Sequence, residues 1–382
     1  MTEFIPAAAR ARIAQLDLEI QSLQDSDLLD GLLIEREQAH RALADYKYPI
    51  LSLPTEITSE IFVHFLPAYP QRPELVGLLS PSLFLQVCRH WRDVALATPA
   101  LWSTMMLQVV GGSNFYSEEH DLLDTWLQRS GHCPLSISFE CTQQTPLIAA
   151  SVESILRHAS RLQDMYLCLP FENLKQFATV SMPILHRLTV GPTAFSFTFG
   201  HPDPAEASEI FMQAPNLQAV TLSGCFNPFQ TPLPWAQITS LTADALFPGE
   251  AIEIFQHTTA LVKCTMTFYH DDDEPVAIRQ LPPLPVRSMR LLWKDDVPRS
   301  STVELFKVLN LPELECLRVS EVVLGRDPID SLTALRRNGR LKLVEIVDVK
   351  QVSREVYNTA FPDVKVFLND EYYPEDSQMD SE

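Results

Sequence analysis

One apolar pattern recurs along the second half of the chain and constrains the fold more than any other feature of the sequence. Written as apolar-x-x-apolar-x-apolar, it returns about every 20 to 32 residues. Its occurrences are Leu162/Met165/Leu167, Leu185/Leu188/Val190, Leu217/Val220/Leu222, Ile238/Leu241/Ala243, Leu261/Cys264/Met266, Val286/Met289/Leu291, Leu314/Leu317/Val319, Leu341/Val344/Ile346 and Phe361/Val364/Val366. A single short strand cannot bury its apolar face and its backbone edges alone, whereas strands stacked in parallel bury both.

The pattern therefore predicts an α+β or α/β solenoid with a parallel sheet. The apolar residues of each repeat would face a continuous core, and the residues between them would line an exposed, concave face. Helices or loops would cover the other side. Apolar alternation also occurs in ordinary sheets, so a sheet without repeats is the alternative.

The N-terminal residues 1–47 are predicted to form a coiled-coil-like helical segment. Residues 7–46 are rich in Ala, Leu, Glu, Gln and Arg and contain no proline, which favours helix. Two apolar stripes alternate spacings of three and four, namely Ile13/Leu16/Ile20/Leu23 and Leu29/Leu32/Arg36/Ala39/Leu43/Tyr46. The second stripe is offset from the first, so we expect a skip or a hairpin near Asp25 to Asp27. Either the segment packs on its own neighbour or it self-associates through residues 7–46.

Two shorter helices are predicted between residues 48 and 107. The first carries apolar residues at helical spacing and ends before Pro67, and the second spans Ser82 to Ala97 and ends at Thr98-Pro99. A proline-bearing loop, Pro67 to Pro81, joins them. The apolar positions are Ile57, Ile61, Phe62 and Leu66 in the first helix and Leu83, Val87, Trp91 and Val94 in the second.

Three sequence blocks follow one another in this region. They are Leu53-Pro54-x-Glu56-Ile57 with Ile61-Phe62 and Leu66, then Val87-Cys88-Arg89-x-Trp91-Arg92 with Ala95, and Thr98-Pro99-x-Leu101-Trp102. With these blocks, which cover about 50 residues, the region resembles the F-box family, in the version common among fungal proteins, where a coiled-coil-like helix precedes the box. The loop from Ala68 to Ser80 is longer than in compact family members. The later repeats, several of which have a proline two residues ahead, resemble the irregular leucine-rich repeats often found behind an F-box.

The resemblance implies a substrate-recognition adaptor of an SCF-type ubiquitin ligase. Residues 48–107 would be the F-box domain and would bind the small adaptor subunit of the ligase, itself attached to a cullin. Leu53 and Pro54 would sit at that contact, and Ile57, Ile61, Leu83, Val87 and Trp91 would contribute or support its apolar surface. Residues 108–368 would be the leucine-rich-repeat-like domain that holds a target protein for ubiquitination. The alternative is a non-catalytic scaffold that is not linked to ubiquitination.

Charge and cysteine usage limit the partners and the compartment. The 49 acidic residues outnumber the 29 basic ones and give a net charge of −20, which disfavours nucleic acid and anionic membranes as partners. The start of the chain lacks the features of an export signal, and no apolar run approaches the roughly 20 residues that span a bilayer. The seven scattered cysteines form no CxxC. We therefore expect a soluble protein with reduced thiols, in the cytoplasm or the nucleus.

The sequence predicts neither catalysis nor a cofactor. It has no glycine-rich phosphate loop, no GxSxG and no HExxH. The segment His270-Asp271-Asp272-Asp273-Glu274 could bind a divalent cation through oxygen ligands, but adjacent residues of an extended loop point in different directions. We interpret it as an acidic surface loop, with a metal-dependent enzyme as the less favoured alternative.

The residue between the last two apolar positions of each repeat predicts the target-binding face. These residues are Tyr166, Thr189, Thr221, Thr242, Thr265, Arg290, Arg318, Glu345 and Lys365. With Arg187 and Lys263 nearby, Arg290 and Arg318 would make a positive strip that recognises an acidic or phosphorylated segment. Ordinary solvated strand residues are the alternative reading. The acidic end, residues 369–382, is predicted to be a disordered tail.

Overall fold

The computed structural model describes most of the chain, and the account below is restricted to that part. The described residues are 5–22, 26–46, 49–109, 117–141, 146–192, 211–223, 233–268, 281–294, 305–306, 308–338, 340–349 and 351–369. Within these ranges no helix is long and apolar enough to cross a bilayer.

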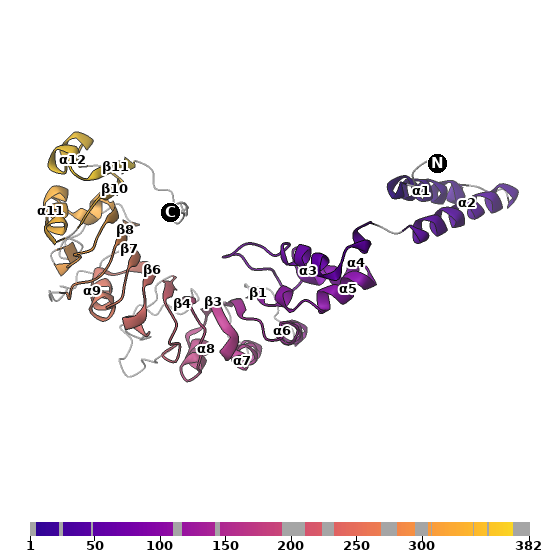
Figure 1. Ribbon diagram of the computed structural model, residues 1–382, viewed down its shortest axis with the longest axis horizontal. Helices are drawn as coiled ribbons and strands as arrows, with labels where there is room; N and C mark the ends of the chain where they lie inside the picture. The colour runs from indigo at the N-terminus through magenta and orange to yellow at the C-terminus, as the bar shows by residue number, and fades with distance from the viewer. Residues whose placement is uncertain are drawn as a thin grey trace.

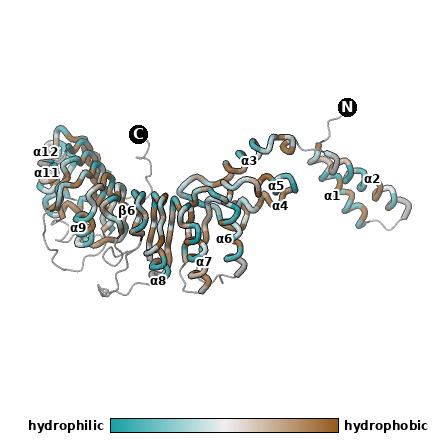
Figure 2. Tube along the Cα trace, turned by 60° about the horizontal axis from the view of Figure 1, so that its bottom comes forward, coloured by the Kyte–Doolittle hydropathy of each residue, from teal (hydrophilic) through white to brown (hydrophobic). Residues whose placement is uncertain are grey.

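The N-terminal segment forms two helices that lie side by side. They are α1 (Pro6–Ser22) and α2 (Ser26–Asp45). Ile13 and Leu16 are buried between them. The ion pair of Arg12 with Glu35, 2.9 Å from Nε to Oε1, ties one helix to the other. The offset between the two predicted stripes therefore corresponds to two separate helices that pack on each other. Figure 1 and Figure 2 show this pair at one end of the molecule, apart from the sheet.

A compact helical unit follows in residues 49–103. Its elements are η1 (Pro49–Ser52), α3 (Thr55–Val63), η2 (Pro81–Leu83), α4 (Phe84–Val87), α5 (Arg89–Leu96) and η3 (Pro99–Trp102). The prediction of one continuous helix over 82–97 is wrong. Cys88 is extended, with φ −160° and ψ 169°, and its Sγ accepts a hydrogen bond from the N–H of Trp91. The extended Cys88 therefore separates α4 from α5, and its thiol caps the N-terminus of α5. Val87, before the break, is exposed, whereas Val94, after it, is buried.

The rest of the fold is α/β, built on one open sheet of parallel strands. The strands are β1 (Thr104–Val109), β2 (Leu135–Cys141), β3 (Leu162–Leu169), β4 (Arg187–Pro192), β5 (Ala219–Leu222), β6 (Ser240–Leu246), β7 (Lys263–Phe268), β8 (Ser288–Trp293), β9 (Cys316–Ser320), β10 (Leu343–Val347) and β11 (Lys365–Asn369). They lie in chain order, each paired in parallel with the next. Figure 1 shows the strands along the inner side of an arc and the helices along its outer side.

The apolar pattern predicted the core well. All of its residues, from Leu162 to Val366, are buried, and each occurrence coincides with a strand or the turn before it. β1 and β2 extend the sheet at its N-terminal end, ahead of the first recognised repeat. The last repeat is shifted, because Val344 pairs with Val366 and Glu345 therefore pairs with Phe367.

The outer side carries short helices with apolar inner faces. They are α6 (Ser117–Arg129), α7 (Pro146–Leu156), α8 (Phe171–Leu174), α9 (Pro248–His257), α11 (Pro328–Asn338) and α12 (Arg354–Ala360). Ile148 and Val152 of α7 and Ile254 and Phe255 of α9 are typical, since all four are buried against the sheet core. One continuous hydrophobic core runs from Phe62 of the helical unit into the sheet.

The first turn of α9 makes stability sensitive to pH. Burial raises the pKa of the Glu250 carboxyl to about 7 from an ordinary 4.5, although the N–H of Phe247 donates to this carboxylate. Because the folded pKa is above the unfolded one, this group's contribution to stability is fully present below about pH 4.5 and is lost as the pH rises through 7.

We therefore expect Glu250→Gln, which keeps an oxygen acceptor for Phe247, to flatten the fall in stability over this pH range. Urea unfolding of both proteins at a series of pH values measures the slopes. Glu253→Gln on the same helix is the control. Equal slopes in wild type and Glu250→Gln would refute the assignment.

Candidate functional site

The helical unit has an apolar surface that its own core does not cover. Ile57 and Ile61 lie four residues apart on α3 and are 50% and 47% exposed, and Val87 is 52% exposed. Pro54, which precedes α3, is exposed and Leu53 is half-buried. Residues at i and i+4 share one helix face, so α3 presents the two isoleucines outward together.

The core of the unit is complete without these residues. Phe62 of α3 is buried and stacks on Phe84 at 4.0 Å between ring centroids, and Trp91 meets Phe62 edge-on at 5.0 Å. Trp91 is thus a core-supporting residue, although its indole N–H is buried without a hydrogen bond among the described residues. Leu83 is half-buried beside this aromatic cluster. Phe62 of α3 therefore faces the core, while Ile57 and Ile61 lie on an adjacent face of the helix that is exposed.

The loop between α3 and η2 attaches the helical unit to the sheet. The Pro73 carbonyl accepts a hydrogen bond of 2.7 Å from the Met106 N–H, and Glu74 forms a parallel bridge with Met106, so the loop covers the free edge of β1. The Arg72 Nε donates to Ser136 Oγ on β2 at 3.0 Å. The loop from Ala68 to Ser80 therefore joins the helical unit to the sheet.

The same loop presents apolar residues that the sequence analysis missed. Val76, Leu78 and Leu79 are 56%, 81% and 75% exposed. Ser80 is buried, and its Oγ donates to the Leu75 carbonyl at 2.9 Å, so hydrogen bonds hold this turn in place. The apolar run Leu75-Val-Gly-Leu-Leu79 within a proline-bearing loop is the sequence feature that could have indicated this exposed apolar surface.

The inner face of the sheet carries the predicted target-binding residues in a single column. The register aligns Tyr166, Thr189, Thr221, Thr242, Thr265, Arg290, Arg318 and Glu345 across β3 to β10. The prediction of Lys365 as the last member is wrong, because the register puts Phe367 beside Glu345. Burial raises the pKa of the Tyr166 hydroxyl.

Arg187 does not join the other predicted basic residues. It lies on β4, four strands from Arg290, where it pairs with the buried Asp164 of β3. Its guanidinium also lies 4.3 Å from the ring centroid of Tyr69, which comes from the loop of the helical unit, and Arg72 lies over the same ring at 5.8 Å. The predicted positive strip is therefore divided, and at its Arg187 end the charge is paired with Asp164 although the Arg187 side chain is still 46% exposed.

Arg290 and Arg318 lie side by side at the other end of the predicted strip. They are direct register partners on β8 and β9, and Lys263 of β7 aligns with Ser288, two residues before Arg290. Arg318 Nε lies 3.6 Å from Glu345 Oε2, and the two side chains are 13% and 11% exposed. The sheet therefore brings Lys263, Arg290 and Arg318 together.

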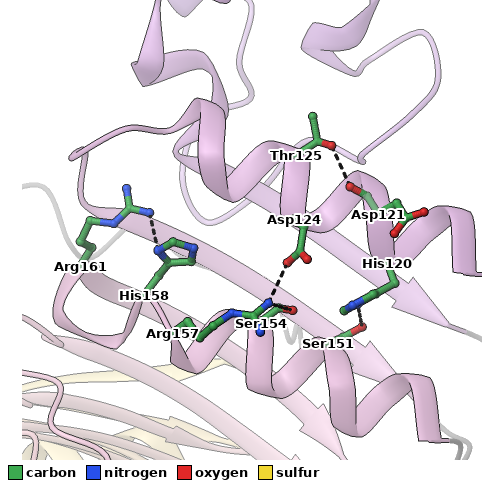
Figure 3. Close-up of polar contacts among 9 residues, drawn as sticks. All are labelled: His120, Asp121, Asp124, Thr125, Ser151, Ser154, Arg157, His158 and Arg161. Carbon is green, nitrogen blue, oxygen red and sulfur yellow. Dashed lines mark hydrogen bonds and ion pairs between the residues drawn. The ribbon is translucent and has the colours of Figure 1, made fainter.

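A polar cluster on the outer side joins α6 and α7 (Figure 3). His120 Nδ1 lies 3.1 Å from Ser151 Oγ, and Arg157 of the following turn contacts both Asp124, at 3.4 Å, and Ser154, at 2.7 Å. Ser151 is fully buried, so this serine–histidine contact offers no access to a substrate. The cluster holds neighbouring helices together.

Arg161, which Figure 3 shows in contact with His158, fixes the end of α6. Arg161 donates to the carbonyls of Leu127 and Cys133 and lies 3.1 Å from His158 Nδ1. Burial, with the nearby Arg161 and Arg157, lowers the pKa of His158. Arg161 therefore acts as a helix cap that also links two repeats.

Among the described residues no group of three His, Cys, Asp or Glu side chains could hold a metal ion. The acidic segment His270 to Glu274 lies outside the described residues. No protein-family model matches the chain, and no curated protein matches its sequence. The case for a function therefore depends on the two surfaces described above.

Proposed function

We propose that this protein is an F-box protein, a substrate-recognition adaptor of an SCF-type ubiquitin ligase. The helical unit would be the F-box, and the ordered parallel strands would be an irregular leucine-rich-repeat solenoid. The observation that carries the proposal is the outward face of α3, where Ile57 and Ile61 are half exposed although the aromatic core of the unit is already complete. A stable unit of this size leaves such apolar surface for a partner.

The proposed docking surface contains most of the residues that the family resemblance assigns to it. Leu53, Pro54, Ile57, Ile61 and Val87 have accessible surface for a ligase adaptor subunit. Trp91 would support that surface from within rather than touch the partner, because it lies against the aromatic core. Leu83 is half-buried and would contribute to the same surface.

The proposed mechanism is proximity. The inner face of the sheet would hold a target protein, and the ligase, through its cullin, would bring a ubiquitin-charged carrier enzyme near the target's lysines. The raised effective concentration accelerates transfer without chemistry by this chain. The loop contacts at Met106 and Ser136 favour this arrangement, since they fix the docking surface relative to the target face. Such a receptor would act in the cytoplasm or the nucleus.

Co-purification from cells tests the proposal. We expect the chain to retain the adaptor subunit and the cullin, and we expect Leu53→Ala combined with Pro54→Ala to abolish most of that capture, since burial of one leucine stabilises a contact by roughly 1.5 to 3 kcal/mol. An intact chain that retains neither subunit would favour a scaffold without a ligase role. Capture that is unaffected by the double substitution would refute the assigned contact.

A further inference from the structure

The sheet face contains two neighbouring arginines, and among the described residues only one of them lies beside a carboxylate. Arg290 and Arg318 are register partners on neighbouring strands, and Glu345 is the carboxylate that lies beside Arg318, on the next strand. Within the described part of the chain Arg290 makes no hydrogen bond or ion pair, and the buried Nε of Arg318 has no hydrogen-bond partner. Among the described residues, this pair of arginines therefore has a single carboxylate beside it at this point of a strongly acidic protein.

This arrangement is electrostatically unfavourable unless an anion binds. Strands in a sheet are about 4.8 Å apart, so like charges directly opposite each other destabilise the pair. The burial of Arg318, whose side chain is only 13% exposed, strengthens that repulsion because water screens it less. Arg187 on the same face shows the contrasting case, since Asp164 neutralises it.

We propose that Arg290 and Arg318 bind the carboxylate of an acidic residue in an extended peptide. The inference rests on the proposed function, because it names the chemistry by which the sheet face would recognise a target. Two planar guanidiniums can offer paired N–H donors to a carboxylate, which suits arginine better than lysine.

The residues around the arginine pair indicate the direction of the bound peptide and the position of an apolar residue in it. Phe367 of β11 is 49% exposed and lies in the same column, two strands beyond Arg318. Two strand spacings are about 10 Å, the length of about three residues of an extended chain. On the other side the column continues as the hydroxyl of Thr265. The ligand would therefore run across the strands, with an apolar residue about three positions from its acidic residue.

Binding to an oriented peptide array tests the proposal without any ligase subunit. The probes are peptides with a central glutamate, glutamine or phosphoserine and a leucine about three residues away, applied to the full chain. We expect retention of the glutamate peptides to exceed that of the glutamine peptides about ten- to hundredfold, as for charge-assisted hydrogen bonds. Arg290→Gln and Arg318→Gln should each remove this preference.

Arg287→Gln is the matched control, because this exposed arginine just before β8 is already paired with Glu313. Should Arg318→Gln not fold, Arg290→Gln still decides the question, since Arg290 supports no other described contact. Equal binding of glutamate and glutamine peptides, or a preference that survives Arg290→Gln, would overturn the proposal. Retention of phosphoserine peptides alone would overturn the choice of a carboxylate. Loss of adaptor capture with intact peptide selectivity would refute only the ligase role.

Discussion

Ile57→Ser combined with Ile61→Ser should weaken binding of the ligase adaptor subunit by roughly 10- to 10²-fold. Each isoleucine has about half of its side chain exposed in the free chain. Complete burial of an isoleucine contributes roughly 1.5 to 3 kcal/mol, so burial of the exposed half of each side chain contributes about half as much, and loss of two such contributions corresponds to that range of affinity. The stability of the chain should change little, because neither residue belongs to the buried core. Titration of the purified adaptor subunit against both proteins measures the effect.

Val356→Ser on α12 is the matched control for this experiment. Val356 is 49% exposed, as Ile57 and Ile61 are, but it lies at the opposite end of the molecule. Its substitution should leave adaptor affinity unchanged. If Val356→Ser and the double isoleucine variant reduce affinity equally, the loss is nonspecific and the proposed docking surface is wrong.

Glu321→Ala should lower the free energy of unfolding by about 3 to 5 kcal/mol, the largest stability effect that we expect from a single polar substitution. Glu321 is fully buried after β9. Its carboxylate accepts hydrogen bonds from the N–H groups of Gln351 and Val352, at 2.6 and 3.0 Å, and from the Tyr357 hydroxyl at 2.9 Å. Burial and the bond to Glu321 raise the pKa of Tyr357, so this hydroxyl remains a donor. The substitution leaves three donors unpaired, among them the buried hydroxyl of Tyr357.

Urea unfolding followed by circular dichroism measures this effect. Tyr357→Phe, which removes one donor together with its bond, should lower the free energy of unfolding by about 2 kcal/mol. Glu355→Ala, at an exposed position of α12, should have almost no effect. A Glu321→Ala protein as stable as Glu355→Ala would show that the C-terminal repeats do not depend on this buried carboxylate.

The sequence predicted the sheet better than the helical unit, and the reason is physical. Each strand has an apolar residue at every second position. The residues that face the core, such as Leu188 and Val190, must be buried whatever conformation the loops adopt. In the helical unit, a side-chain contact rather than apolar spacing decides where the second helix is divided. The extended Cys88 divides the predicted second helix, and its thiol cap is invisible to helical spacing.

The register of the last strand was predicted wrongly for a different reason. Phe361, Val364 and Val366 are all buried, so the apolar pattern alone could not choose among registers two residues apart. The pairing of Val344 with Val366 makes the choice, and it replaces Lys365 with Phe367 in the central column. A shift of two residues preserves the face of every side chain and therefore leaves no trace in hydrophobic periodicity.

The candidate sites were predicted in part. The column from Tyr166 to Glu345 follows from strand periodicity and was predicted correctly as a line of neighbours. The grouping of Arg187 with Arg290 failed, because charge pairing depends on residues of adjacent strands and of the helical-unit loop. Asp164 and Tyr69 are separated from Arg187 in sequence and have no spacing that relates them to it.

Hydrogen–deuterium exchange of the full chain, alone and with the purified ligase adaptor subunit, tests the central claim most directly. The account predicts a stable complex in which α3 and the segment from Leu53 to Pro54 gain protection, while the inner face of the sheet exchanges as in the free chain. No complex, or protection confined to the sheet strands, would contradict the claim that the outward face of α3 is the site where a second subunit binds.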